Sequence, residues 1–276
     1  MLIISKLKIL SIKYLHKRLI DKIFFVFLVK ILNNFMEKSR KLASVVAQEL
    51  RAMGDKQKAK EMSRYFKTGY GEYAEGDVFL GIGTEEVRDV AKKYFKQINL
   101  SQTALLLQSK YHEMRRVGVE ILVQKMSKER DEHKRSKILS CYLNNLSGIN
   151  NWDLVDASAP PLLGAFIDDK DKTILYDFVV SDDLWKQRIA LLATFYFIRK
   201  GNYGDTLAII EMLIDNKQDL IHKAMGWMLR EIGKRSFETE LKFLDKYAAT
   251  LPRTALRYAI ERLDEDLREY YMNLTE

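Results

Sequence analysis

The sequence predicts an all-α protein that is built from successive helical hairpins. Two observations favour this fold class. Apolar residues recur at helical spacing through most of the chain after Glu37, whereas the sustained apolar–polar alternation that is typical of strands is absent. In addition, only 3 prolines and 13 glycines interrupt the 276 residues, which is too few for a protein of many short strands and turns. A chain of this length with 47% hydrophobic residues can bury a substantial core.

The helices are predicted from apolar stripes and from the residues that begin and end them. The first is expected to end at Gly54, and another begins with Thr84 as its N-cap and with Glu85 and Glu86 in its first turn. The stretch Gly69–Gly76 between them is expected to be a surface loop. Residues 174–180 could also form a buried strand, although no partner strand is evident. Further helices are predicted near residues 111–126, 132–146, 183–199, 217–234, 237–248 and 252–263.

A weak internal repeat indicates that the hairpins stack as a solenoid. Gly118, Ala190 and Gly226 each follow polar or basic residues and precede an apolar helical stretch. They lie 72 and 36 positions apart, which suits two and one hairpins of two antiparallel helices. A small residue at these positions is expected to let a neighbouring helix approach closely.

The first 35 residues differ from the rest of the chain. They carry seven basic side chains and one acid, so this segment accounts for +6 of the net charge of +8 and leaves +2 for residues 36–276. The apolar run of residues 23–29 is too short to cross a bilayer, which needs roughly 20 residues. We expect that residues 1–35 come from an upstream start and that residues 36–276 form a single domain. A signal peptide and a basic helix on a membrane surface remain alternatives.

Several kinds of site are poorly supported by the sequence. The single cysteine, Cys141, excludes an intramolecular disulfide and favours a reducing compartment, which we expect to be the cytoplasm. No glycine-rich phosphate-binding motif occurs, and neither a cofactor nor a metal is expected. The histidines lack the spacing of a zinc site and are His16, His112, His133 and His222.

The most informative segment begins at Asn150. Trp152 and Asp156 are four positions apart and therefore share one face of a helix that Asn150 or Asn151 can cap. Asp153 lies in the first turn, where the helix dipole explains it adequately. Spacing alone favours an ordinary interpretation, in which Trp152 is a core aromatic residue and Asp156 is exposed or ion-paired.

Two later helices carry side chains of related chemistry. Arg188 begins an apolar helix close to Lys186, and Trp227 follows Gly226 within another. A tryptophan in so apolar a helix usually belongs to the core. Stacked hairpins would nevertheless bring these positions to one concave wall, and an acid between aromatic faces with a guanidinium nearby suits a cationic sugar or base beside a phosphate.

The occurrence of Trp152, Asp156, Arg188 and Trp227 in this order resembles the AlkD family of DNA alkylation-repair glycosylases. The resemblance extends over roughly residues 40–265. The resemblance implies a right-handed α-solenoid of HEAT-like repeats whose concave side binds duplex DNA. It also implies hydrolysis of the N-glycosidic bond of cationic N3- and N7-alkylated purines, with the lesion still stacked in the duplex. The matching segments are residues 62–67, 79–84, 152–156, 184–188, 224–231 and 251–261.

The resemblance also implies a role for each matching residue. Asp156 corresponds to the catalytic carboxylate, Trp152 and Trp227 to the aromatic walls, Arg188 to a contact with the DNA backbone, and Tyr65 to a tyrosine of the cleft. The implied partner is duplex DNA containing alkylated purines. The protein is expected to be a monomer and not to associate with a membrane.

Further basic residues of the same helices are expected to contact phosphates, namely Lys186, Lys223 and Arg230. Salt-dependent weakening of DNA binding on loss of Arg188 is expected for the same reason. The extra Gly69–Gly76 stretch and the unusual N-terminus depart from the family pattern, but neither removes a catalytic position.

Two other functions remain compatible with the sequence. One is a catalytically silent solenoid that recognises damaged or branched DNA. The other is a HEAT scaffold that binds proteins, which fits a body charge of only +2. Binding to plain duplex DNA would exclude the scaffold, and release of bases from methylated DNA would distinguish the enzyme from the silent binder.

Overall fold

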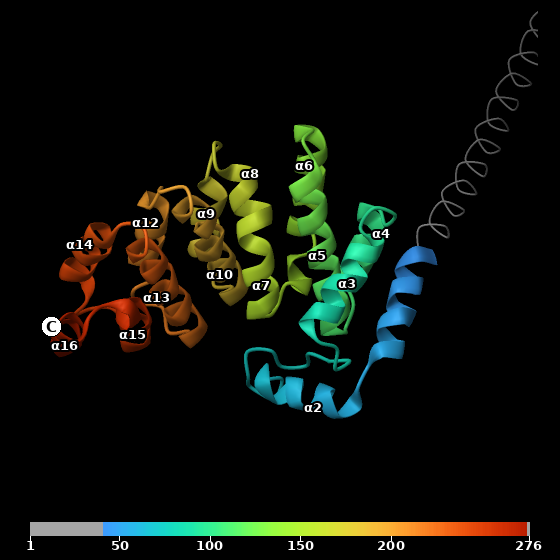
Figure 1. Cartoon of the computed structure of the whole chain (residues 1–276), viewed down its shortest axis with the longest axis horizontal. Helices are drawn as coiled ribbons and strands as arrows, with labels where there is room; N and C mark the ends of the chain where they lie inside the picture. The colour runs from blue at the N-terminus through green and yellow to red at the C-terminus, as the bar shows by residue number, and fades with distance from the viewer. Residues whose placement is uncertain (1–40, 275–276) are drawn as a thin grey trace, which may run out of the picture.

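The computed structural model describes residues 41–274, and this region is helical with no strand. A single bridge between Val78 and Tyr111 is its one β-type contact. Successive helical hairpins follow one another in an arc, and α2 lies beneath the first of them (Figure 1). The all-α prediction is therefore confirmed. The predictions made for residues 1–35 lie outside the described residues.

The first described helix covers residues 41–53. The following α-helices are α2 (Lys56–Tyr65), α3 (Thr84–Tyr94), α4 (Leu100–Leu107), α5 (His112–Lys128), α6 (Glu132–Leu143), α7 (Trp152–Ser158), α8 (Ala165–Ile167), α9 (Thr173–Val179), α10 (Leu184–Ala193), α11 (Phe195–Ile198), α12 (Gly204–Met212), α13 (Asp219–Gly233), α14 (Phe237–Tyr247), α15 (Arg253–Ala259) and α16 (Glu265–Asn273). Two short 3-10 turns, η1 (Leu146–Gly148) and η3 (Ile260–Arg262), and a π-helical turn, η2 (Ala159–Gly164), complete the set.

Most predicted helices appear close to their expected bounds, and the differences have local causes. Residues 174–180, for which a buried strand was the alternative, lie almost entirely in α9. The expected helix over 183–199 is interrupted at Thr194, whose hydroxyl donates a hydrogen bond to the carbonyl of Leu191 at 2.6 Å. Such local bonds compete with the regular helical pattern and explain the break between α10 and α11.

The start of α3 also differs from the prediction. Gly83 occupies the N-cap position, with extended backbone and no capping side chain, and its carbonyl accepts from the amide of Val87 at 3.1 Å. Thr84 is therefore the first helical residue and not the cap. Glu85 and Glu86 lie in the first turn as expected, where the helix dipole favours their charge.

The small residues of the internal repeat lie where helices approach closely. A Cβ atom added at Gly226 would collide with the carbonyl oxygen of Ala255 and with Cβ of Tyr258. At Gly118 it would lie 3.0 Å from Cγ of Leu107, and Ala190 is fully buried. The predicted close approach is thus confirmed. At Gly226 it brings α13 against α15, directly beside Trp227.

The helix that carries the tryptophan and the aspartate is fixed at its start. Asn151 is the N-cap, and its side-chain oxygen accepts a hydrogen bond from the amide of Trp152 at 2.8 Å. The chain then continues from α7 through the π-helical turn into α8. Asp156 consequently lies one turn inside a helix whose N-terminal end is capped by Asn151.

Two apolar clusters form the core, and both include side chains of α5. Val117 and Ile121 belong to the cluster built with the first described helix and α3, whereas Val119 and Leu122 belong to the larger cluster that continues to α16. Helix α5 therefore connects the two clusters. Within residues 41–274, no helix is long and apolar enough to cross a membrane.

Candidate active site

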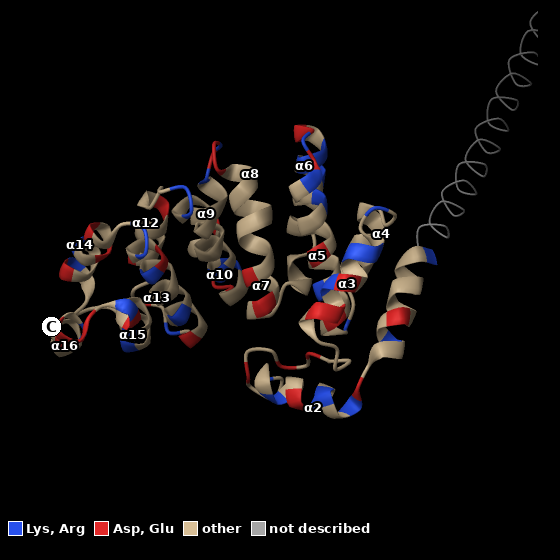
Figure 2. Cartoon of the chain, in the orientation of Figure 1, with Lys and Arg blue, Asp and Glu red and all other residues tan. Residues whose placement is uncertain are grey.

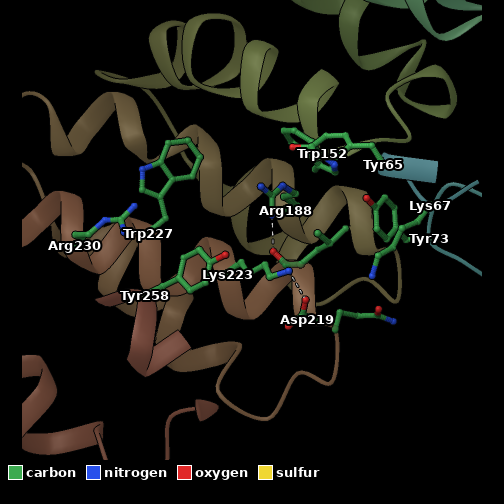
Figure 3. Close-up of a pocket in the computed structure, with 12 residues that line it drawn as sticks. Tyr65, Lys67, Tyr73, Trp152, Arg188, Asp219, Lys223, Trp227, Arg230 and Tyr258 are labelled. Atoms are coloured by element: carbon green, nitrogen blue, oxygen red, sulfur yellow. Dashed lines mark hydrogen bonds and ion pairs between the residues drawn. The ribbon is translucent and has the colours of Figure 1, made fainter. Parts of the chain in front are cut away.

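A cavity of about 480 Å³ collects most of the residues that the sequence singled out, and we call it the cleft pocket. Figure 3 shows Trp227, Arg230 and Tyr258 on one side, Tyr65, Trp152 and Tyr73 on the other, and Arg188 between them. These side chains come from α2, α7, α10, α13 and α15 and from the loop of residues 66–83. The predicted residues that line the cleft pocket are Tyr65, Trp152, Arg188, Lys223, Trp227 and Arg230.

Asp156 and Arg188 form a bidentate ion pair between α7 and α10. Nε of Arg188 donates to Oδ1 of Asp156 at 2.9 Å, and Nη2 donates to Oδ2 at 2.8 Å. The third nitrogen, Nη1, donates to the carbonyl of Leu220. Arg188 is only 4% exposed, so its charge is committed to these partners. This geometry favours a role in holding Asp156, and the contact with a DNA phosphate stays a prediction.

The environment of Asp156 acts on its pKa in two opposing ways. Burial raises the pKa of the carboxyl group, whereas the charge of Arg188 and its hydrogen bonds lower it, and the net shift is upward from the usual value. Each carboxylate oxygen retains a lone pair that Arg188 does not occupy. The side chain of Asp156 is 19% exposed, so part of it faces open space.

That open space is a second cavity of about 610 Å³, which we call the carboxylate pocket. Asp156 lines this pocket and not the cleft pocket. Tyr65 and Trp152 border both cavities and stand between them. Trp152 and Asp156 line the carboxylate pocket together, so the prediction that they share a helix face is confirmed.

The indole of Trp152 packs against other aromatic rings. Phe66 stacks on it with centroids 5.2 Å apart and an interplanar angle of 18°, and Phe79 stacks on Phe66 at 4.9 Å. Tyr65 meets the indole edge-on at 6.1 Å. Trp152 is thus neither a fully buried core residue nor a free one, because it is held by a stack and still borders two cavities.

The opposite wall of the cleft carries partly buried cations that pair with exposed acids. Nζ of Lys223 lies 2.7 Å from a carboxylate oxygen of Asp219, and this hydrogen bond raises the pKa of Lys223. Arg230 pairs with Glu261, whose side chain is 61% exposed. Trp227 lies between these cations with its ring 5.7 Å from that of Phe195. Solvent-exposed acids can exchange for other anions at small cost.

Lys186 is not part of this arrangement, since it lines neither cavity. Charge is also spread over other faces of the described chain. Figure 2 shows lysines and arginines on α2 and α13, but also on α6 at the top of the view. The local arrangement of cations, rather than their total, must therefore support any argument for DNA binding.

Sequence reasoning missed two residues that the loop of residues 66–83 brings to the cleft pocket. Tyr73 lines it and meets the ring of Trp185 edge-on at 6.2 Å, and burial raises the pKa of the Tyr73 hydroxyl. Lys67 lines it too, with a positive φ of 53°. The glycine- and tyrosine-rich composition of this loop was the available signal, but it predicts exposure and not the path of the chain.

Tyr258, on α15, was also missed as a member of the cleft pocket. Its place follows from the close contact of α13 with α15 at Gly226. Within the described residues, no group of histidine, cysteine, aspartate and glutamate is arranged to hold a metal ion.

The family to which the chain belongs can be assigned from comparison with known sequences. The family profile described as DNA alkylation repair enzyme matches residues 46–263. The chain belongs to this family. Its membership supports a role in the repair of alkylated DNA. No match was found among curated proteins.

A solved structure has a similar fold. It is a predicted DNA alkylation repair enzyme from Enterococcus faecalis, with 21% sequence identity and a TM-score of 0.62. The alignment covers 77% of this chain and 98% of that protein. At this level of identity the likeness concerns the fold, and the chemistry must be argued from the residues themselves.

Proposed function

We propose that the protein is a DNA glycosylase of base excision repair. In this proposal it hydrolyses the N-glycosidic bond of purines that carry a positive charge from alkylation at N3 or N7, within duplex DNA. The observation that carries the proposal is the carboxylate of Asp156, oriented by Arg188 beside Trp152. An arginine-held carboxylate in a pocket that adjoins a cleft lined by aromatic rings and cations suits such a reaction.

The chemistry of the substrate explains why a single carboxylate can suffice. A cationic alkylpurine leaves as a neutral base, so the leaving group needs no general acid. As the bond breaks, positive charge develops on the deoxyribose. A carboxylate about 4 Å away stabilises that charge by roughly 4 kcal/mol at an effective dielectric constant of about 20. In this proposal Asp156 also orients the attacking water.

Arg188 offsets part of this stabilisation, and the balance can be estimated. If the sugar lies on the far side of the carboxylate, about 7 Å from the guanidinium, the repulsion is roughly 2 kcal/mol, and the pair still contributes about 2 kcal/mol net. Loss of the carboxylate alone removes the full attraction and leaves the guanidinium unpaired. The expected cost is about a thousandfold in rate, from roughly 4 kcal/mol.

The remaining residues of the site serve binding in this proposal. Trp152 and Trp227 offer ring faces to the cationic sugar or base, each worth about 0.5–2 kcal/mol. Lys223 and Arg230 exchange their exposed acids for phosphates of the duplex. These contacts are independent of sequence, which suits an enzyme that must act wherever a lesion occurs.

The test is base release from methylated duplex DNA. The full chain is incubated with the duplex, and the liberated bases are identified by mass, with a protein-free reaction subtracted. We expect release of N7-methylguanine or N3-methyladenine. Asp156→Asn should lower the single-turnover rate about a thousandfold and change duplex affinity less than about twofold.

A matched control and the contradicting outcomes complete this experiment. Asp169→Asn removes an acid whose side chain is 85% exposed and that lines neither pocket, and it should retain full activity. Unchanged release by Asp156→Asn would remove Asp156 from the mechanism. Duplex binding without base release by the unaltered protein would instead favour a silent DNA-binding solenoid, and the absence of both would favour a protein-binding scaffold.

A further inference from the structure

A buried histidine at the start of α5, next to the first turn of α7, contacts carboxylates through both ring nitrogens. Nδ1 of His112 lies 3.0 Å from Oδ2 of Asp77, and Nε2 lies 2.9 Å from Oδ2 of Asp153. The side chains of His112 and Asp77 are each only 2% exposed. Ionised carboxylates accept hydrogen bonds and cannot donate them. Both ring nitrogens must therefore donate, which requires the positively charged imidazolium.

The two carboxylates belong to different parts of the molecule. Asp77 lies in the loop of residues 66–83, and Asp153 lies in the first turn of α7. Asp77 also accepts from the side-chain amide of Asn151, the N-cap of α7, at 3.4 Å. His112, the first residue of α5, thus ties the loop to the start of the helix that carries Trp152.

A second connection runs through aromatic rings. The imidazole of His112 stacks on Phe79 with centroids 4.5 Å apart, and it lies 5.2 Å from the ring of Phe66. Phe66 in turn stacks on Trp152. A cation over these rings is further stabilised by their electron-rich faces. The charge of His112 is therefore coupled to Trp152 both by hydrogen bonds and by ring stacking.

We propose that His112 is a positioning residue for base release: as an imidazolium it fixes the first turn of α7 against the loop of residues 66–83, and thereby sets Trp152 and Asp156. This proposal rests on the proposed glycosylase function, which it deepens by naming a residue that acts through others. When His112 loses its proton, one ring nitrogen becomes an acceptor that faces a carboxylate. One of the two bonds is then lost. If it is the bond to Asp153, the first turn of α7 is held on that side only by Arg116, which donates to the carbonyl oxygen of Asp153 at 2.7 Å and to its Oδ2 at 3.3 Å.

Asp153 is the weaker of the two attachments. Its Oδ2 receives only one further bond, from Nη1 of Arg116 at 3.3 Å, and its Oδ1 is buried without a partner in the region 41–274. Asp77 retains Arg115 and Asn151 as partners when the ring becomes neutral. The bond to Asp153 is hence the one expected to break. The charged groups that face the cluster from the loop, α5 and α7 are Asp77, Arg115, Arg116 and Asp153, with Glu120 and Arg88 beyond Arg116.

The pH at which this occurs follows from the opposing effects on the ring. Burial alone would lower the pKa of His112, but the charges of Asp153 and Asp77 and their hydrogen bonds outweigh it and raise the pKa to about 8. The pKa is thus raised above its usual value of about 6.5. The stabilisation of the folded state by the charged ring is therefore complete below about pH 6.5 and is lost as the pH rises through about 8.

The first experiment measures the charge of the ring directly in the full chain. Imidazole nitrogen resonances, assigned with His112→Gln, report protonation of His112 as the pH is raised from about 6 to 9, the range that brackets the pKa of about 8. We expect a doubly protonated ring at neutral pH, and a shift of the Trp152 indole resonance on the same titration curve. A neutral ring at neutral pH would overturn the proposal, as would an indole that does not follow the titration.

The second experiment measures single-turnover base release over the same pH range. The rate of the unaltered protein should decline as His112 deprotonates. His112→Gln should be about tenfold slower at neutral pH, lose this alkaline decline, and retain duplex affinity within about threefold. His133→Gln, at an exposed histidine of α6, is the matched control and should change nothing. An alkaline decline that persists in His112→Gln would overturn the proposal.

Asp153→Asn provides an independent check if the glutamine variant fails to fold. It removes the partner on α7, so the pKa of His112 should fall and the alkaline decline should move to lower pH. An unmoved decline would contradict the proposal. The two proposals can also fail separately: absence of base release would remove the glycosylase function, whereas the resonance titration would still test whether His112 holds Trp152.

Discussion

The two walls of the cleft pocket are built in different ways. On the side of α7 and α10, charges are buried and held by several partners, as where Arg188 of the cleft pocket pairs with Asp156 of the adjoining carboxylate pocket. On the wall formed by α13 and α15, the cations Lys223 and Arg230 pair with exposed acids. The first arrangement fixes geometry, and the second offers charge that can be exchanged.

This difference separates two tasks that a repair enzyme must perform. Chemistry needs a carboxylate whose position does not change as charge develops, because preorganised groups cost no rearrangement during the reaction. DNA binding needs cations that can leave their protein partners for phosphates, and exposed ion pairs lose little when they do so. Substitutions on the two walls should therefore affect different measured quantities.

After Asp156→Asn, the largest effect that distinguishes the walls is expected for Arg188→Ala. It leaves Asp156 buried without its partner, so the carboxylate can rotate or take up a proton, and the single-turnover rate should fall about a hundredfold. Duplex affinity should change less than about threefold, because the guanidinium is committed to Asp156 and Leu220.

Arg188→Lys is the matched control for that prediction. A lysine keeps the charge but cannot form both hydrogen bonds, so an intermediate loss of about tenfold is expected. Thermal unfolding of each variant checks that the fold is retained. A salt-dependent loss of affinity with a normal rate would show instead that Arg188 contacts a phosphate, as the family resemblance implies.

Lys223→Ala and Arg230→Ala should have the opposite signature. Each should weaken duplex binding about three- to tenfold and reduce the slope of log affinity against log salt by about one unit. The rate at saturating DNA should remain within about twofold. Lys242→Ala, at an exposed lysine of α14 that lines neither pocket, controls for net charge. A lower saturating rate for either variant would break the division between the walls.

The smallest expected effect concerns Lys67, which follows α2 in the left-handed region with a φ of 53°. The amide of Thr68 donates to the carbonyl of Ser63 at 3.1 Å, which is the helix-ending arrangement that favours glycine at residue 67. Lys67→Gly should therefore raise the free energy of unfolding by about 1 kcal/mol, measured by urea titration. It should also weaken duplex binding about two- to fourfold, because a cation of the cleft pocket is lost.

Lys67→Ala separates these two contributions. It removes the same ammonium group but keeps a side chain in the strained conformation, so affinity should fall equally while stability does not rise. If glycine and alanine give the same stability, the backbone at this position stores no strain. If neither changes duplex affinity, the loop of residues 66–83 lies outside the DNA footprint.

The fold could be predicted from local patterns because helices depend on near neighbours. The stripes near 111–126 and 217–234 gave α5 and α13, and Gly226 correctly indicated close helix packing. Errors arose where a local hydrogen bond or cap decided the outcome. The hydroxyl of Thr194 interrupts a long apolar stretch, and Gly83 rather than Thr84 begins α3.

The site could be predicted only in part, since its decisive contacts join distant segments. Helical spacing alone places Trp152 and Asp156 on one face, but the pairing of Asp156 with Arg188 spans 32 positions and has no periodic signal. Tyr73 reaches the cleft through a loop whose path no pattern encodes. For His112 the sequence indicated only that the histidine spacing does not match a zinc site. Its carboxylate partners lie 35 and 41 positions away, so no local pattern reveals them.

The glycine at 226 gives the engineer of such a protein a starting point. There the main chain of α13 lies against the carbonyl oxygen of Ala255 and Cβ of Tyr258, so the separation of α13 and α15 in the groove beside the neighbouring indole depends on this close contact. A single methyl group at that position would wedge the last helices outward. A variant meant to widen the groove would therefore change Gly226 first, with compensating changes at Ala255 and Tyr258.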